Sequence, residues 1–293
     1  MFIERFTNYL KYEKRFSAHT VSAYLQDLHQ FEVFLSLSNS DFSAATHDDI
    51  RSWMVEMLDK NREARSIQRK LSSLRTFYKF LEREMLVGNN PSRLVKAPKA
   101  PRRLPVFVED KNVNELLDSN DIFSDNFEGL RDRVVLELLF GTGIRLAELV
   151  MLKDQDINKY EQTIRVFGKR SKERIIPLNV SLMKLLKHYI IEKSGQNFDN
   201  FSESLLVTSE GKPAYPKLIY RIVNKYLSQV STNKKTSPHV LRHSFATSLL
   251  NKGADLNAIK ELLGHSSLAA TQVYTHNAAE RLKTIYKQAH PKA

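Results

Sequence analysis

A chain of 293 residues is long enough for two domains, each with its own buried core. It has 45 Lys and Arg residues against 33 Asp and Glu residues, and this formal charge of +12 favours a polyanionic partner, nucleic acid before an acidic membrane surface. The chain has no cysteine, which excludes disulfides, thiolate nucleophiles and cysteine-based zinc sites.

The sequence offers no segment suited to crossing a membrane. Its most apolar stretch, residues 134–144, contains Glu137 and is far shorter than the roughly 20 residues that a spanning helix needs. The first apolar residues are interrupted by charge, unlike those of a signal peptide. We therefore expect a soluble, cytoplasmic and nucleoid-associated protein.

The first 90 residues predict four helices joined by short polar turns. The first two cover residues 2–12 and about 20–37, and Thr46 is a suitable N-cap for the third. In the fourth, apolar residues recur at three- and four-residue spacing, which indicates a face packed on a core. These residues are Ile67, Leu71, Leu74, Tyr78, Leu81 and Met85.

A second face of the fourth helix is basic. Ser72 and Thr76 lie among its cationic side chains, so the row is suited to phosphate oxygens. Taken alone, a solvated helix surface explains such a row at least as well. The row consists of Arg62, Arg65, Arg69, Lys79 and Arg83.

A basic, proline-rich segment follows the helices. Proline removes backbone donors and favours extended chain, so we expect residues 93–106 to link a helical domain over residues 1–92 to a second domain over residues 107–293. The segment holds no acid, and Lys99, Arg102 and Arg103 are candidate contacts to a phosphate backbone. A plain solvated linker is the alternative.

The second domain is predicted to be mostly helical with one hairpin. Strands over residues 163–167 and 173–177 flank a polar turn. Helices are predicted over residues 109–117, about 127–140, from near 145, and over 180–191, 216–230, 238–251, 255–262 and 278–288.

One predicted helix concentrates polar chemistry. Pro238 begins it, and His239 and Arg242 stand three residues apart, so their side chains project from neighbouring positions on one face. His239 and His243 are four apart, as in zinc helices, but the glutamate of the His-Glu-x-x-His motif is missing and no third ligand is evident. We therefore expect no metal. A lone histidine is more often a buried core residue, so further motifs must support a catalytic role.

Such motifs occur in order along the chain: Gly-Thr-Gly-Ile-Arg-Leu-Ala-Glu-Leu at 141–149, His-Val-Leu-Arg-His at 239–243, Leu-Leu-Gly-His-Ser at 262–266 and Thr-Gln-Val-Tyr-Thr-His at 271–276. In this order and spacing the chain resembles the tyrosine recombinases of phage-integrase type. Its compact layout is most similar to the chromosomal Xer recombinases (XerC and XerD).

The resemblance implies a mainly α fold. It implies an N-terminal four-helix, SAM-like domain that clasps DNA, and an α+β catalytic domain with a small antiparallel sheet. The two domains would form a C-shaped clamp on double-stranded DNA.

The resemblance also implies roles for single residues. Tyr274 would attack the scissile phosphate and form a 3′-phosphotyrosyl link, with His239 as the proton acceptor. Arg145 and Arg242 would hold the non-bridging oxygens, and His265 would donate a hydrogen bond to the same phosphate. Because the ester bond conserves energy, we expect no cofactor.

Two assignments within the motifs have alternatives. The family's general acid is a lysine in a β-hairpin turn, here Lys169, although Lys172 lies close by. Glu148 matches the family's acidic position and would orient a histidine or an arginine, with a surface salt bridge as the alternative. His265 could instead be a helix C-cap.

The same resemblance implies an assembly. We expect a homo- or heterotetramer on a recombination site, with a paralogous recombinase or a DNA translocase as possible partners. In the family, a C-terminal helix docks onto the adjacent protomer; packing on its own domain is the alternative here. The expected role is chromosome dimer resolution. The alternatives are a mobile-element integrase, a type IB topoisomerase and a DNA-binding protein that does not cut.

Overall fold

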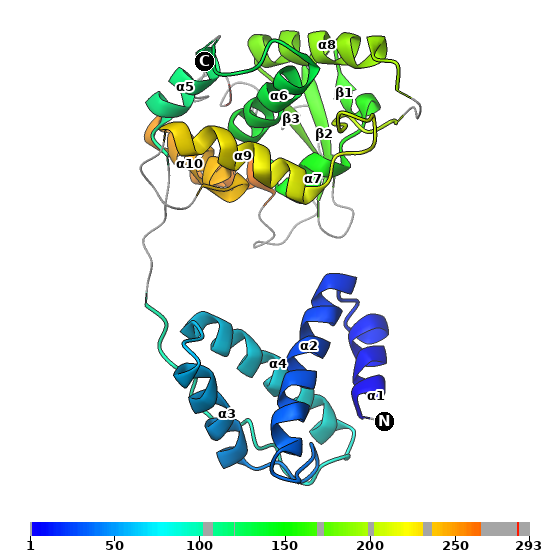
Figure 1. Cartoon of the computed structure of the whole chain (residues 1–293), viewed down its shortest axis with the longest axis vertical. Coiled ribbons are helices and arrows are strands. Elements are labelled where there is room, and N and C mark those ends of the chain that lie inside the picture. Colours follow the sequence, from blue (N-terminus) through cyan, green and yellow to red (C-terminus); the bar gives the residue numbers. More distant parts are fainter. Residues whose placement is uncertain are drawn as a thin grey trace. The chain divides into compact units, whose positions relative to one another are not determined.

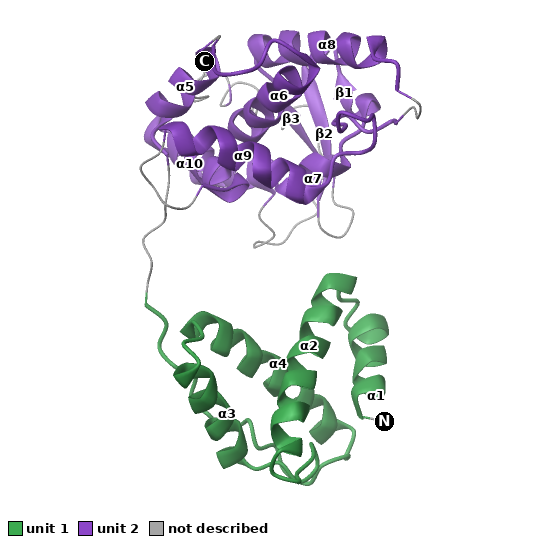
Figure 2. Ribbon diagram, in the orientation of Figure 1, with its two compact units in different colours: residues 1–104 green, residues 105–293 purple. Residues whose placement is uncertain are grey.

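The computed structural model describes residues 2–101, 108–119, 121–168, 173–198, 202–230, 236–264 and Tyr286. The chain divides into two compact units, residues 1–104 and 105–293 (Figure 2). Each unit encloses its own cluster of buried apolar side chains. The fold is mainly helical, with a small antiparallel sheet in the second unit, as the sequence predicts.

The four predicted N-terminal helices are present in the first unit (Figure 1). Thr46 caps the third as predicted, and its hydroxyl and the Asp49 carboxylate form a reciprocal capping box. The predicted first helix continues past residue 8 as a short π-helix. The elements are α1 (Phe2–Asn8), the π-helix η1 (Tyr9–Glu13), α2 (Ala18–Ser36), α3 (His47–Asp59) and α4 (Ala64–Arg83).

The predicted apolar face of α4 is buried, except at its end. Met85 is 92% exposed, so its assignment to the core face was wrong. The helix stops at Arg83, and Met85 adopts a left-handed backbone with φ of 55°, which turns the chain away from the helical face.

Much of the segment expected to link the domains packs on the first unit. Val95 is buried, and its carbonyl oxygen accepts a hydrogen bond of 2.5 Å from Arg75. The carbonyl oxygen of Pro98 accepts one of 2.7 Å from Gln68. Two donors on α4 thus satisfy backbone acceptors that proline-rich chain cannot pair with itself.

A buried acid joins α2 to α4. Asp27 is only 1% exposed, and its carboxylate accepts hydrogen bonds from Arg69, from Lys70 at 3.1 Å and from Ser73 at 2.8 Å. A buried charge is tolerated only with such complete pairing. The network therefore fixes how these two helices pack.

The second unit is built around α6, which is buried on nearly all sides. Helix α8 packs on one side of it, and α9 and α10 pack on the other (Figure 1). The helices are α5 (Asp110–Asp118), α6 (Phe127–Thr142), α7 (Leu146–Met151), the short 3-10 helix η2 (Asp154–Asp156), α8 (Val180–Gly195), α9 (Pro216–Val230), α10 (Pro238–Asn251) and α11 (Leu256–Leu263).

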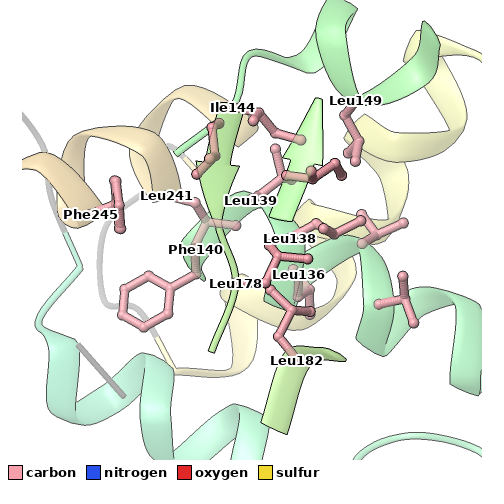
Figure 3. Packing of buried hydrophobic residues seen from close by; sticks show 14 of the residues in the cluster. Leu136, Leu138, Leu139, Phe140, Ile144, Leu149, Leu178, Leu182, Leu241 and Phe245 are labelled. Carbon is pink, nitrogen blue, oxygen red and sulfur yellow. The ribbon is translucent and has the colours of Figure 1, made fainter. Parts of the chain in front are cut away.

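The predicted hairpin is confirmed with the predicted bounds. Strands β2 (Thr163–Phe167) and β3 (Glu173–Pro177) pair antiparallel, and a short strand β1 (Ile157–Asn158) that the sequence pattern did not reveal pairs with β2. Apolar side chains of α6, α8 and α10 pack together in the core of this unit (Figure 3). Tyr286, in the predicted C-terminal helix, is buried in this same core and donates a 2.7 Å hydrogen bond to the Gly141 carbonyl oxygen.

Replacing the buried acid tests the packing of the first unit. We expect Asp27→Asn to lower its free energy of unfolding by about 3 kcal/mol, because two cations lose their charged partner. Trp53 is the single tryptophan and is buried in this unit, so its fluorescence during urea unfolding reports on this unit. Glu32→Gln, at an exposed contact with His29 rather than on the same helix's buried side, should change stability by less than about 0.5 kcal/mol. Equal losses of stability in both variants would contradict the role of Asp27 in holding α2 against α4.

Candidate active site

Arg145 lies at the junction of α6 and α7. Gly143 ends α6 in a left-handed conformation, with φ of 60°. A Cβ atom there would lie 2.4 Å from the Phe245 ring and 2.9 Å from the Leu263 side chain, so only glycine fits. The turn makes Arg145 the N-cap residue of α7, where its side chain is about one-third exposed.

Glu148 holds Arg145 from one turn along α7. Its carboxylate accepts a 2.8 Å hydrogen bond from the Arg145 backbone N–H and a 2.7 Å bond from Nη1 of the Arg145 guanidinium. Arg145 thus has its backbone and side chain fixed by one acid. These bonds are the contacts that the orienting role predicted for Glu148 would need.

Arg174 is the second partner of Glu148, and sequence reasoning missed it. Its Nη1 and Nη2 donate to the two carboxylate oxygens at 2.9 and 2.7 Å, and both side chains are buried. Arg174 and Ile176 are two residues apart in β3, so both side chains lie on its inner face. The sequence did offer one signal for this residue, an arginine at a strand position that alternation directs towards the core.

Arg242 approaches the same place from α10. Its guanidinium is buried and donates to the carbonyl oxygens of Gly143 and, at 2.6 Å, Leu263. Burial, and then the nearby charge of Arg145, lower the pKa of Arg242 to about 10. The guanidinium therefore stays protonated at neutral pH.

The three arginines converge on the end of α11. The consecutive carbonyl oxygens of residues 262–264 accept hydrogen bonds from Arg174 at 2.8 Å, Arg242 at 2.6 Å and Arg145 at 2.8 Å, in that order. A helix C-terminus leaves such carbonyls unpaired and carries partial negative charge, so cations are favourable there. The arginines thereby fix the chain immediately before His265.

His239 lies in the first turn of α10 and is exposed. It precedes the buried Arg242 by three residues, so it stands beside Arg242 on the solvent side of the helix. Lys169, Lys172, His265 and Tyr274 lie outside the described residues. The described part of the site therefore consists of Arg145, Glu148, His239 and Arg242, together with Arg174.

The candidate DNA contacts of the first unit differ in their surroundings. Arg69 pairs with the buried Asp27, and Arg83 pairs with Glu13 and Glu84. Arg102 and Arg103 lie outside the described residues. The other candidates are exposed: Arg62, Arg65, Lys79 and Lys99.

The charge of the cluster is suited to an anion. Three guanidinium groups and one carboxylate leave a formal charge of +2 around the junction. Within the described ranges, no group of three or more His, Cys, Asp or Glu side chains could hold a metal ion. Nor does any helix in those ranges have the length and apolar character needed to cross a bilayer.

Comparison with known proteins identifies the family. Residues 107–281 match the phage integrase family, and residues 3–85 match the N-terminal SAM-like domain of phage integrases. Tyrosine recombinase XerC of Bacillus subtilis (strain 168) is 37% identical over 300 residues, covering 100% of this chain and 97% of the relative. The chain belongs to the phage integrase family of tyrosine recombinases.

Further relatives agree with this assignment. Tyrosine recombinase XerD of Staphylococcus haemolyticus (strain JCSC1435) is 35% identical, with 99% of each chain covered. Among solved structures, the XerH site-specific recombinase bound to a palindromic difH substrate has a TM-score of 0.74 at 22% identity, covering 96% of this chain and 82% of that one. This tyrosine recombinase thus shares its fold with that structure, and its family consists of DNA breaking and rejoining enzymes.

The charge of Glu148 in the recombinase should be visible in its acid stability. Burial alone would raise the pKa of Glu148, but the hydrogen bonds from Arg174 and from the Arg145 backbone lower it to about 2. Because the folded-state pKa lies below the ordinary value of 4.5, the ionised carboxylate stabilises the fold above about pH 4.5, and this stabilisation is lost as the pH falls towards 2.

We therefore expect Glu148→Gln to remove part of the acid dependence. The difference in the free energy of unfolding between pH 7 and pH 3 should shrink by on the order of 2 kcal/mol, measured by circular dichroism in urea. Glu203→Gln, at an exposed pair with Lys153, serves as the control and should leave this difference nearly unchanged. An unchanged difference in Glu148→Gln would mean that the carboxylate is not held by the arginines.

Proposed function

We propose that this recombinase cleaves DNA at a specific site by forming a 3′-phosphotyrosyl bond to Tyr274 and releasing a free 5′-hydroxyl. The observation that supports this most is the linked cluster of Arg145, Glu148 and Arg242, with exposed His239 one turn before Arg242. A phosphodiester under attack by a tyrosinate gains a second negative charge, and the cluster complements it because, with Arg174 included, its formal charge is +2.

The chemistry divides between groups that bind and groups that move protons. Arg145 and Arg242 would hold the non-bridging oxygens, since planar guanidinium groups match them with paired donors. His239 would accept the proton of Tyr274, whose phenol has an ordinary pKa near 10 and needs a base near neutral pH. His265 would donate a further hydrogen bond to the phosphate.

Lys169 would give a proton to the leaving 5′-oxygen, with Lys172 as the alternative donor. The phosphorus keeps its bond to the 3′-oxygen and exchanges the 5′-oxygen for the tyrosine oxygen. In the reverse step a 5′-hydroxyl attacks phosphorus and the tyrosine leaves. No bond energy is lost, so the cycle requires no cofactor.

For the biological reaction, we propose strand exchange through a Holliday junction in a homo- or heterotetramer bound to double-stranded DNA. The relatives named XerC and XerD favour a role in chromosome dimer resolution, with a paralogous recombinase and a regulating DNA translocase as candidate partners. The exposed cations before, on and after α4 (Arg62, Arg65, Lys79 and Lys99) would contact DNA phosphates. Integration of a mobile element is the alternative role.

Covalent capture tests the proposed chemistry. The preferred site is first selected from a randomised duplex pool, and a nicked duplex carrying it is then incubated with the protein without magnesium. We expect a protein–DNA adduct on a denaturing gel for the wild type and none for Tyr274→Phe. Tyr220→Phe, at an exposed tyrosine in the same unit, should form the adduct like the wild type.

Each result has a definite meaning. Adduct formation by Tyr274→Phe, or tight site binding by the wild type without any adduct, would contradict the assignment of Tyr274. Relaxation of plasmids that lack the site, without junction products, would favour a topoisomerase over a recombinase.

A further inference from the structure

The guanidinium of Arg174 is buried on the inner face of the sheet, and each of its three nitrogens donates a hydrogen bond. Arg174 is 5% exposed, and a buried cation is costly unless its donors are paired. Its Nη1 and Nη2 bind the Glu148 carboxylate, and its Nε donates to the Leu262 carbonyl oxygen at 2.8 Å. One side chain thus connects β3 to both α7 and the end of α11.

The bonds from Arg174 also limit what Glu148 can do to Arg145. The carboxylate has two oxygens, and each accepts one bond from Arg174 and one from Arg145. Only one of the two Arg145 donors is a guanidinium nitrogen, because the other is the backbone N–H. Without Arg174, both carboxylate oxygens would be open to the Arg145 guanidinium, which is the preferred geometry for this pair.

Arg174 stands next to the hairpin turn as well. The last pair of the β2–β3 ladder joins Phe167 to Glu173, the residue before Arg174. The segment between these strands contains Lys169, the proposed general acid. The hydrogen bond from Arg174 to Leu262 ties this hairpin to the end of α11. Leu262 lies three residues before His265, another proposed phosphate ligand.

We propose that Arg174 is a positioning residue for DNA cleavage. It occupies the Glu148 carboxylate so that the Arg145 guanidinium keeps donors for the phosphate, and it holds the hairpin and the end of α11 against the same acid. This inference rests on the proposed function for its effect on cleavage. It concerns Arg174 itself, which has no direct contact with the reacting atoms.

The kinetic test compares single-turnover adduct formation at saturating protein. We expect Arg174→Met to slow it by on the order of 100-fold while the Kd for DNA stays within about threefold of wild type, because the side chain is buried. Arg174→Lys keeps the charge but cannot bridge both oxygens and the carbonyl, so it should be slowed at least tenfold. Arg165→Met is the matched control and should cleave like wild type. It removes an arginine of the adjacent strand β2, which pairs with Asp156.

A second substitution separates positioning from general support of the fold. If Arg174 acts by occupying Glu148, then Glu148→Gln should cause no further loss in the Arg174→Met background, or should recover part of the rate, although it slows the otherwise wild-type enzyme. Additive losses from the two substitutions, or wild-type rates in Arg174→Lys, would overturn the proposal. Should Arg174→Met fail to fold, the comparison is made with Arg174→Lys.

Hydrogen exchange without DNA tests the positioning independently of cleavage. The Arg145 backbone N–H is bound to Glu148, so Arg174→Lys should speed exchange in peptides covering residues 143–150 and 258–264, and Arg165→Met should not. Unchanged exchange in these peptides would overturn the proposal. If the wild type forms no adduct but Arg174→Lys shows the expected faster exchange, the proposed cleavage chemistry is refuted and the positioning role is supported.

Discussion

Among the residues that the structure describes, arginines donate four hydrogen bonds to the buried carboxylate of Glu148. Three guanidinium groups gathered around one junction would otherwise repel each other in a poorly hydrated environment. Glu148 offsets one charge and leaves the remainder for an anionic substrate. The site therefore depends on an acid that has no direct part in the proposed chemistry.

The geometry around this acid arises from helix ends that meet. Gly143 ends α6 without a side chain, which lets Phe245 of α10 and Leu263 at the end of α11 approach it closely. The carbonyl groups of Gly143 and Leu263, at the ends of α6 and α11, then become acceptors for Arg242. Carbonyl groups that a helix terminus leaves unpaired thus fix the direction of a side chain that we propose to be catalytic.

The hydrophobic core sets these ends in place. Leu241 and Phe245 of α10 pack in the same buried cluster as Phe140 of α6 and Ile144 beside Arg145 (Figure 3). Their neighbour on α10, Arg242, is therefore carried into the junction by apolar packing on either side. A rigid arrangement of this kind lowers the reorganisation needed when a phosphate binds.

Local patterns in the sequence predicted most of the helices and the hairpin, whereas Arg145, His239 and Arg242 became candidates through the family motifs. Local patterns failed where structure depends on partners distant in the chain. The pairing of Arg69 with Asp27 spans 42 residues, and α4 alone presents Arg69 as one more cation in a row. Arg174 was missed for the same reason, since its role appears only when β3, α7 and α11 are brought together.

If the arginine cluster neutralises charge on the scissile phosphate, removing that charge from the DNA should make Arg242 much less necessary for cleavage. The measurement is the rate of adduct formation by Arg242→Ala on a nicked site whose scissile phosphate is replaced by an uncharged methylphosphonate. We expect Arg242→Ala to cleave the methylphosphonate much faster than the ordinary phosphate. Equal or slower cleavage of the methylphosphonate would contradict it.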